Sequence, residues 1–133
     1  DVPKGKIRMN VQDFDKLVED WLNNIRITLM VKGGEYSGEM DRLLNFKDAA
    51  CLLQCTPEKA LLGFVTKHIV SVYDTVSHEK TREETYWKEK LGDIINYCIL
   101  LDALIKERKE SMVGVVGVEV LGWHQPVQRG EVS

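Results

Sequence analysis

The stretch WKEKLGDIINYCILLDALIKER, from Trp87 to Arg108, decides the fold that we expect for this chain. Its apolar residues recur at alternating spacings of four and three positions, which is typical of a helix packed in an antiparallel bundle. The members of this stripe are Trp87, Leu91, Ile94, Cys98, Leu101 and Ile105. Because such a helix needs other helices to cover its apolar side, the stretch predicts an all-α protein.

The helices expected elsewhere in the chain are marked by their starting residues. Asn10 is a favourable N-cap residue, and Thr56 is a second one, followed by Pro57 in the first helical turn. Thr81 and Glu84 fit a capping box at the start of the last helix. The sequence therefore predicts about four helices, spanning residues 11–31, 40–54, 57–76 and 82–110. The stripe expected to face the core from the third helix contains Leu61, Phe64 or Val65, Ile69 and Val72.

The chain changes character after Glu110. Residues 111–133 are rich in valine and glycine and lack a helical period, which favours an extended segment. We therefore expect a helical bundle domain over residues 1–110 and an extended C-terminal arm over 111–133. The arm is expected to lie along the bundle or to reach another subunit.

Composition excludes several classes of protein. The chain has 133 residues, 44% of them hydrophobic, and a net charge of −3, as in ordinary globular domains. There is no basic run for binding nucleic acid and no apolar stretch of the ~18–20 residues that a membrane span needs. Its three cysteines are too few and odd in number for a disulfide framework. We therefore expect a cytoplasmic protein with no nucleic-acid or membrane partner.

Two carboxylates and an amide share one side of the helix from Trp87 to Arg108. On a helical wheel Glu89, Asp93 and Asn96 lie opposite Leu91, and Leu100 stands in line with them. Because their neighbours are apolar, we expect these groups to be partly buried, and buried charges need partners. Two interpretations follow. A lysine, an arginine or a helix N-terminus neutralises the acids structurally, or a divalent cation or ligand does so in a functional site.

The third helix offers a partner face for these acids. Lys67, His68 and Ser71 lie close together on it, and Gly63 in mid-helix predicts the close approach of another helix or a ligand. His68 taken alone is more typical of a hydrogen-bonded, semi-buried histidine. Lys67, His68 and Ser71 facing the acids would form a cleft with cationic and anionic walls. Such a cleft suits a phosphate-bearing molecule with Mg²⁺.

Residues 89–104, EKLGDIINYCILLDAL, resemble the third helix of the MazG-like, all-α nucleoside triphosphate pyrophosphohydrolases. The longer pattern, KGGEYSGEMDRLLNFKDAA, then KHIVSVYD, then EKLGDIINYCILL, is similar to small uncharacterised bacteriophage helical proteins. The resemblance covers about residues 30–108. It implies a dimeric or tetrameric helical bundle that binds nucleotides through Mg²⁺. Asp93 would match the family's metal-binding aspartate, and Glu89 would lie at or next to its glutamate.

The chain departs from the MazG-like pattern in two places. Lys90 stands where many members have a ligand glutamate, and Lys67-His68 occupies the region of their Glu-x-x-Glu pair. A two-helix, four-acid magnesium site therefore cannot be formed by these helices alone. Carboxylates from the glycine-rich segment before residue 42 could substitute, namely Glu35, Glu39 or Asp41.

These observations lead to one hypothesis and two rivals. The chain binds a nucleotide or another phosphorylated ligand, and as an enzyme it would cleave a nucleoside triphosphate with a metal-activated water. Asp93 and Glu89 would hold Mg²⁺, Lys67 would contact the phosphates, His68 and Ser71 would line the cleft, and Asn96 would bind sugar or base. One rival is a non-catalytic protein that sequesters a nucleotide or signal. The other is a protein-interaction module. In each case we expect a homo-oligomer in the cytoplasm, that of the host if a phage encodes it.

Overall fold

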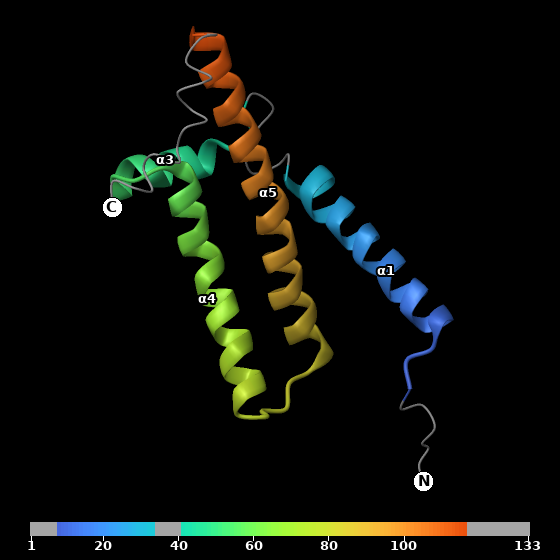
Figure 1. Ribbon diagram of the computed structural model, residues 1–133. Helices are drawn as coiled ribbons and strands as arrows, with labels where there is room; N and C mark the ends of the chain where they lie inside the picture. Colours follow the sequence, from blue (N-terminus) through green and yellow to red (C-terminus); the bar gives the residue numbers. More distant parts are fainter. Residues whose placement is uncertain (1–7, 34–40, 117–133) are drawn as a thin grey trace, which may run out of the picture.

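The structure is a computed structural model that describes residues 8–33 and 41–116 (Figure 1). Every regular element in these two ranges is helical, so the predicted all-α fold is confirmed. The elements are α1 (Val11–Arg26), a π-helical extension η2 (Ile27–Lys32), α3 (Leu44–Leu53), α4 (Pro57–Ser77) and α5 (Glu84–Val116).

The two longest helices, α4 and α5, lie side by side and antiparallel at the centre of the molecule (Figure 1). α1 lies on the other side of α5 and leans away from it toward its own N-terminus, while α3 lies at the end of the bundle where α4 begins (Figure 1). α5 is therefore the helix that the rest of the fold is built around.

The predicted N-terminal caps of the first and third helices are confirmed. The side-chain oxygen of Asn10 accepts a hydrogen bond from the backbone N–H of Asp13 at 2.7 Å. Thr56 Oγ1 accepts one from the backbone N–H of Lys59 at 3.2 Å, and Pro57 occupies the first turn. Each cap satisfies a backbone donor that has no partner within its helix, which fixes where the helix begins.

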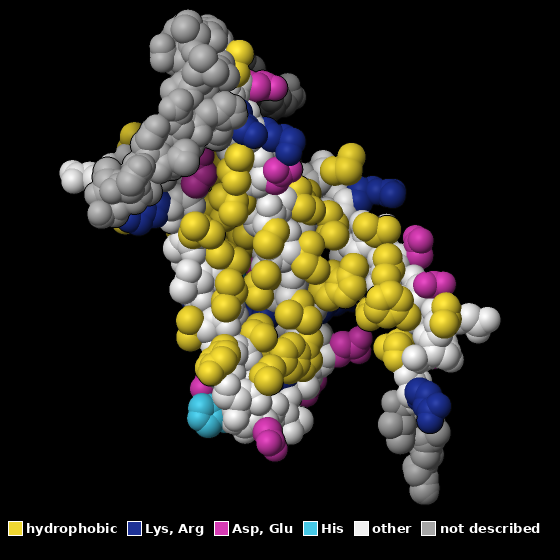
Figure 2. Space-filling model, viewed as in Figure 1, with side chains coloured by type: hydrophobic (Ala, Val, Ile, Leu, Met, Phe, Trp, Pro, Cys, Tyr) yellow, Lys and Arg dark blue, Asp and Glu magenta, His cyan; other side chains and the backbone are white. Residues whose placement is uncertain are grey.

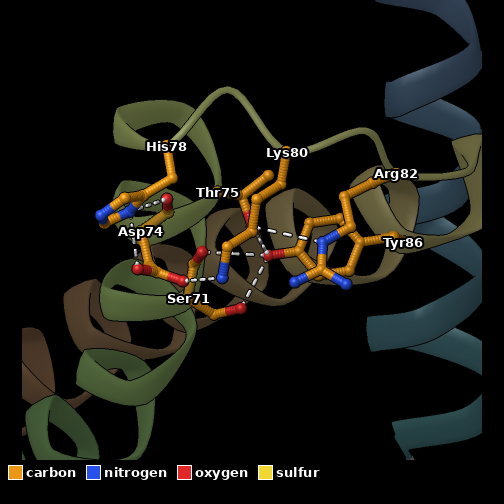
Figure 3. A network of polar contacts seen from close by, with 7 residues as sticks. All are labelled: Ser71, Asp74, Thr75, His78, Lys80, Arg82 and Tyr86. Atoms are coloured by element: carbon orange, nitrogen blue, oxygen red, sulfur yellow. Dashed lines mark hydrogen bonds and ion pairs between the residues drawn. The ribbon is translucent and has the colours of Figure 1, made fainter.

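The start of the last helix differs from the prediction. α5 begins at Glu84, so Thr81 does not cap it. A polar network holds the preceding connection instead (Figure 3). The hydroxyl of Tyr86 lies 2.7 Å from Ser71 Oγ and 2.9 Å from Thr75 Oγ1, and Arg82 stacks on the Tyr86 ring. These contacts hold residues 81–83 in a non-helical path across the end of α4.

α5 also ends later than expected. It continues to Val116, past the predicted end at Glu110. The rest of the proposed arm, residues 117–133, lies outside the described residues.

The hydrophobic core lies where α3, α4 and α5 meet. Its buried members are Leu43, Phe46, Leu61 and Leu104, and Tyr97 packs against them. The ring of Phe46 lies edge-on to that of Tyr97, with 6.3 Å between their centroids, an arrangement that aromatic pairs prefer. The centre of the fold is thus a junction of three helices, and α1 contributes no buried residue to it.

The side of α5 that faces this core is not the one predicted. Asn96 and Leu104 are buried, whereas Cys98 is exposed and Ile105 is 41% exposed. On α4 the expected core residues Leu61 and Val65 are buried, whereas Ile69 from the same stripe is 49% exposed. The aromatic side chains of α3 and α4 pack on the Asn96 side of α5, so the more regular apolar stripe of α5 is only partly covered, with Leu101 against the core.

No helix in the described ranges is both long enough and apolar enough to cross a membrane.

Ion pairs connect the helices near their ends. Arg108 on α5 donates two hydrogen bonds to the carboxylate of Glu58 on α4, at 2.6 and 2.7 Å, and these bonds hold the pKa of Glu58 below its usual range. Lys47 joins Asp41 to Glu107. α4 and α3 are therefore tied to the C-terminal half of α5.

Candidate functional site

The acidic side of α5 lines a pocket of about 360 Å³ between α1 and α5. Glu89, Asp93 and Asn96 all border it, so the structure brings together the three residues that the sequence placed on one side of this helix. The expectation that all three are partly buried is wrong for Glu89, which is exposed because it lies near the N-terminal end of α5; Asp93 is partly buried and Asn96 is buried. The solvent exposure of these side chains therefore decreases along α5 from Glu89 to Asn96.

α1 forms the opposite wall. Trp21, Asn24 and Thr28 recur at spacings of three and four, which puts them on one side of this helical segment. Gly92 lets this wall come close, since a Cβ atom at that position would lie 3.3 Å from Cζ3 of Trp21. The glycine beside Asp93 is thus explained by the approach of α1.

Asn96 carries an unsatisfied acceptor. Only 9% of the residue is exposed, and its Oδ1 atom is buried without a hydrogen-bond partner among the described residues. An unpaired buried acceptor costs about 1–3 kcal/mol, so native proteins contain few of them. Asn96 also lines the pocket, so a partner for this atom from outside the described chain would have to come from that side.

His68 on α4 reaches the same carboxylate from the core side. Its Nε2 lies 3.4 Å from Asp93 Oδ2, and only 10% of its side chain is exposed. The other ring nitrogen, Nδ1, is buried and has no hydrogen-bond partner in the part of the chain that the structure describes. The sequence predicted a semi-buried histidine beside the acids, and the structure places His68 in that position.

The phenol of Tyr97 lies next to this pair. Burial, together with the negative charge of Asp93, raises the pKa of Tyr97 above its usual range. The ring of Tyr97 lies 6.0 Å from that of His68. The surroundings of Asp93 are therefore aromatic on one side and open to the pocket on the other.

A second pocket, of about 240 Å³, adjoins the first. Thr28, Asp93 and Asn96 border both, and Arg42 and Asn45 lie on its far side. The guanidinium of Arg42 donates a hydrogen bond to the backbone carbonyl of Leu29 at 3.0 Å. The two pockets together place a cationic group on one side of Asp93 and the indole of Trp21 on the other.

Two residues of the predicted cleft are elsewhere. Lys67 is exposed on α4 and borders neither pocket. Ser71 takes part in the Tyr86 network at the α4–α5 connection (Figure 3). α4 presents its His68–Thr75 side to α5, which turns Lys67 outward. The predicted cleft with a lysine wall is therefore not formed, and His68 is the residue of that trio which reaches the acids.

The helix that was one of the two expected neighbours of Gly63 is not found. A Cβ atom there would have no neighbour within 4 Å, so no helix of the described residues approaches this glycine. Glu35 and Glu39, the predicted additional metal ligands, lie in the segment 34–40, outside the described residues.

Three wall residues on α1 and η2 were not predicted from the sequence, namely Trp21, Asn24 and Thr28. Their shared spacing was a usable signal, because polar side chains on the contacting side of an amphipathic helix need a polar environment. Lys88, which also borders the pocket, looks like an ordinary surface lysine in the sequence.

The donor set beside Asp93 has the right chemistry for a hard cation. Glu89, Asp93 and Asn96 supply oxygen atoms, the ligands that Mg²⁺ prefers, and Mg²⁺ commonly keeps several waters while bound to one or two carboxylates. Within residues 8–33 and 41–116, however, no group of three or more His, Cys, Asp or Glu side chains could enclose a metal ion. A cation here would rely on its ligand or on water for the remaining coordination.

Fold and pocket together define a small all-α protein with a polar pocket between its first and last helices. No protein-family model, curated protein or solved structure matches the chain. The resemblance to MazG-like proteins therefore stays an expectation from the sequence.

Proposed function

We propose that the pocket between α1 and α5 binds a nucleotide or a similar phosphorylated molecule. The observation that carries this proposal is the buried, unpartnered Oδ1 of Asn96, which borders the pocket beside the carboxylates of Asp93 and Glu89. Buried polar atoms are normally paired, so an unpaired one at a pocket indicates a partner that comes from outside the chain.

The pocket walls match the parts of a nucleotide. The indole of Trp21 offers an aromatic surface for stacking on a base, and Asn24 and Asn96 offer amide groups for hydrogen bonds to base or sugar. Lys88 borders the pocket and takes the phosphate-binding role that the sequence predicted for Lys67. This arrangement supports a ligand that combines a flat ring with negative charge.

Mg²⁺ is part of the proposal. Asp93 and Glu89 would hold the ion through carboxylate oxygens, and the bound ion would neutralise phosphate charge and make a coordinated water more acidic. His68 keeps Asp93 in position from the core side through the 3.4 Å contact. Glu89, which makes no ion pair with any described residue, is left available to the ligand.

Calorimetry with a nucleotide panel tests the proposal. ATP, GTP and the common deoxynucleoside triphosphates are titrated into the protein with and without Mg²⁺. We expect Asp93→Ala to lose Mg²⁺-dependent binding while its helical circular dichroism is unchanged. Asp102→Ala is the matched control, since Asp102 lies on the same helix, is 62% exposed and pairs only with Lys106. Unchanged affinity in the Asp93 variant would place the site elsewhere.

A second candidate is binding without hydrolysis. It is favoured by Lys90, which stands where many MazG-like members have a glutamate, and by the lack of a closed metal-binding cluster in the described structure. Pyrophosphate release from each bound nucleotide separates the two functions. Release that depends on Asp93 supports a pyrophosphohydrolase, whereas tight binding with no release supports a sequestering protein.

We also propose a cytoplasmic location for this activity. All three cysteines are free thiols, which suits a reducing compartment. Recovery of the expressed chain from a periplasmic or secreted fraction with oxidised cysteines would contradict this location.

A further inference from the structure

The stripe that the sequence marks as the core side of α5 is only partly covered in the structure. It repeats at spacings of four and three from Trp87 through Leu91, Ile94, Cys98 and Leu101 to Ile105. None of these residues is buried, Ile105 is 41% exposed and Cys98 is exposed as well. A heptad-type stripe of this regularity is the pattern by which one helix packs against others in a bundle.

α4 carries a matching stripe. Leu62, Ile69 and Val76 recur every seven residues and are 47, 49 and 61% exposed, and Tyr73 beside them is 73% exposed. No charged residue occupies these four positions, so the stripe offers no charge to a partner.

The two stripes lie on the same side of the α4–α5 pair. In each helix the stripe is turned by roughly 90°, in the same rotational sense, from the residues that face the other helix. On α4 the facing residues are Leu61 and His68, and on α5 they are Tyr97 and Leu104. Because the helices are antiparallel, the same sense of rotation brings both stripes to one face (Figure 1).

α1 extends this face. Its apolar residues Phe14, Val18 and Leu22 are 53, 39 and 52% exposed, and they lie on one side of the helix. Figure 2 shows hydrophobic side chains gathered over α4, α5 and α1 on the face turned toward the reader. We call this surface, formed by the three stripes, the apolar face.

The size of the apolar face points to a macromolecular partner. The α5 stripe runs for about 27 Å at ~1.5 Å per residue, and the α4–α5 pair at ~10 Å spacing is about 20 Å wide. This footprint of roughly 540 Å², to which the α1 stripe adds, approaches the ~800 Å² that each partner contributes to a stable protein–protein interface. Monomeric proteins rarely leave an apolar patch larger than about 300–600 Å² exposed.

We propose that the apolar face is the contact surface of a homodimer, in which the α4–α5 pair of one copy packs on the same pair of a second copy. A surface without charged stripe residues can meet itself around a two-fold axis without like-charge repulsion. The spacing of four and three on both helices provides the interdigitating side chains that such a four-helix contact needs. The candidate nucleotide pocket lies between α1 and α5 and borders on different α5 residues, so the dimer stands independently of the proposed ligand.

Sedimentation of the full chain over a range of protein concentrations tests the dimer. We expect twice the chain mass of 15.2 kDa, and we expect Ile69→Glu to reduce the mass to that of one chain. Val70→Glu is the matched control. Val70 is also apolar, adjacent in sequence and 58% exposed, but it lies about 100° round α4 from Ile69, on the side turned away from α5, so this variant should remain dimeric. Circular dichroism of both variants checks that the helices are intact.

Thiol alkylation followed by mass spectrometry locates the interface. We expect Cys98, at the middle of the α5 stripe, to react roughly tenfold or more slowly than Cys51 on α3 in the dimeric protein. A full chain that stays monomeric up to hundreds of micromolar would overturn the proposal, as would a dimer that survives Ile69→Glu. Slow alkylation of Cys98 in a monomer would also overturn it, because residues 117–133 of the same chain would then be the cover.

Discussion

Replacing Asn96 with leucine should make the protein more stable and less able to bind its ligand. The change removes the buried Oδ1 atom that has no hydrogen-bond partner among the described residues. Leucine has the same branched shape as asparagine with a larger volume, and the adjoining pocket of about 360 Å³ leaves room for the difference. The variant thus exchanges an unsatisfied polar group for an apolar one beside Tyr97 and Leu100, which pack on the core.

The expected gain follows from the cost of the unpaired acceptor, about 1–3 kcal/mol. At ~2.1 cal/mol/K per residue, a chain of 133 residues has an unfolding entropy of roughly 280 cal/mol/K near its midpoint. Each kcal/mol then raises Tm by about 4 °C, so Asn96→Leu should raise it by about 4–10 °C.

Thermal and urea unfolding, followed by circular dichroism at one protein concentration, measure this gain. Asn23→Leu is the control, because Asn23 is exposed on α1 and the same chemical change there should alter stability by no more than about 0.5 kcal/mol. Nucleotide with Mg²⁺ should raise the Tm of the wild-type protein and leave that of Asn96→Leu unchanged. A variant less stable than the wild type would refute the reasoning, since it would show that Asn96 is already satisfied within the fold.

Two further predictions concern the helices themselves. Gly63→Ala should stabilise the protein by about 0.5–1 kcal/mol, because a Cβ atom at Gly63 meets only open space. Gly92→Ala should stabilise it less, because its Cβ atom would press on Trp21 at 3.3 Å. Equal gains in the free energy of urea unfolding would contradict the close approach of α1. Arg108 holds the pKa of Glu58 below its ordinary value of 4.5, so the stability from this pair is present above about pH 4.5 and is lost as the pH falls through and below it. Glu58→Gln should flatten that part of the pH–stability curve, and an unchanged slope between about pH 5 and pH 3 would show that the pair does not contribute.

Local signals in the sequence predicted much of the fold. Asn10 and Thr56 cap their helices as expected because an N-cap depends on hydrogen bonds over three residues, which the local sequence specifies. The start of α5 could not be found in this way. It depends on Tyr86, whose hydroxyl contacts Ser71 and Thr75 on another helix, and no local pattern reports such a contact.

The candidate site was predicted on one helix and missed on the others. Glu89, Asp93 and Asn96 share a side of α5 because helical geometry alone puts them there. Which helix faces them is a matter of packing. The sequence suggested Lys67, yet α4 turns that lysine outward, and the opposite wall comes from α1, with Trp21 held against Gly92.

By itself, the amino-acid sequence determined that the chain is helical, where most of its helices begin, and that two acids and an amide share one side of α5, since these properties depend on spacings within a few turns. Only the tertiary structure decided which side of α5 became the core. Two of its sides are apolar enough to be buried, and the side of Asn96 and Leu104 was chosen because Phe46 and Leu61, from two other helices, pack there. The more regular stripe was thereby left partly exposed, because burial depends on which helices meet and periodicity reports only that a helix has an apolar side.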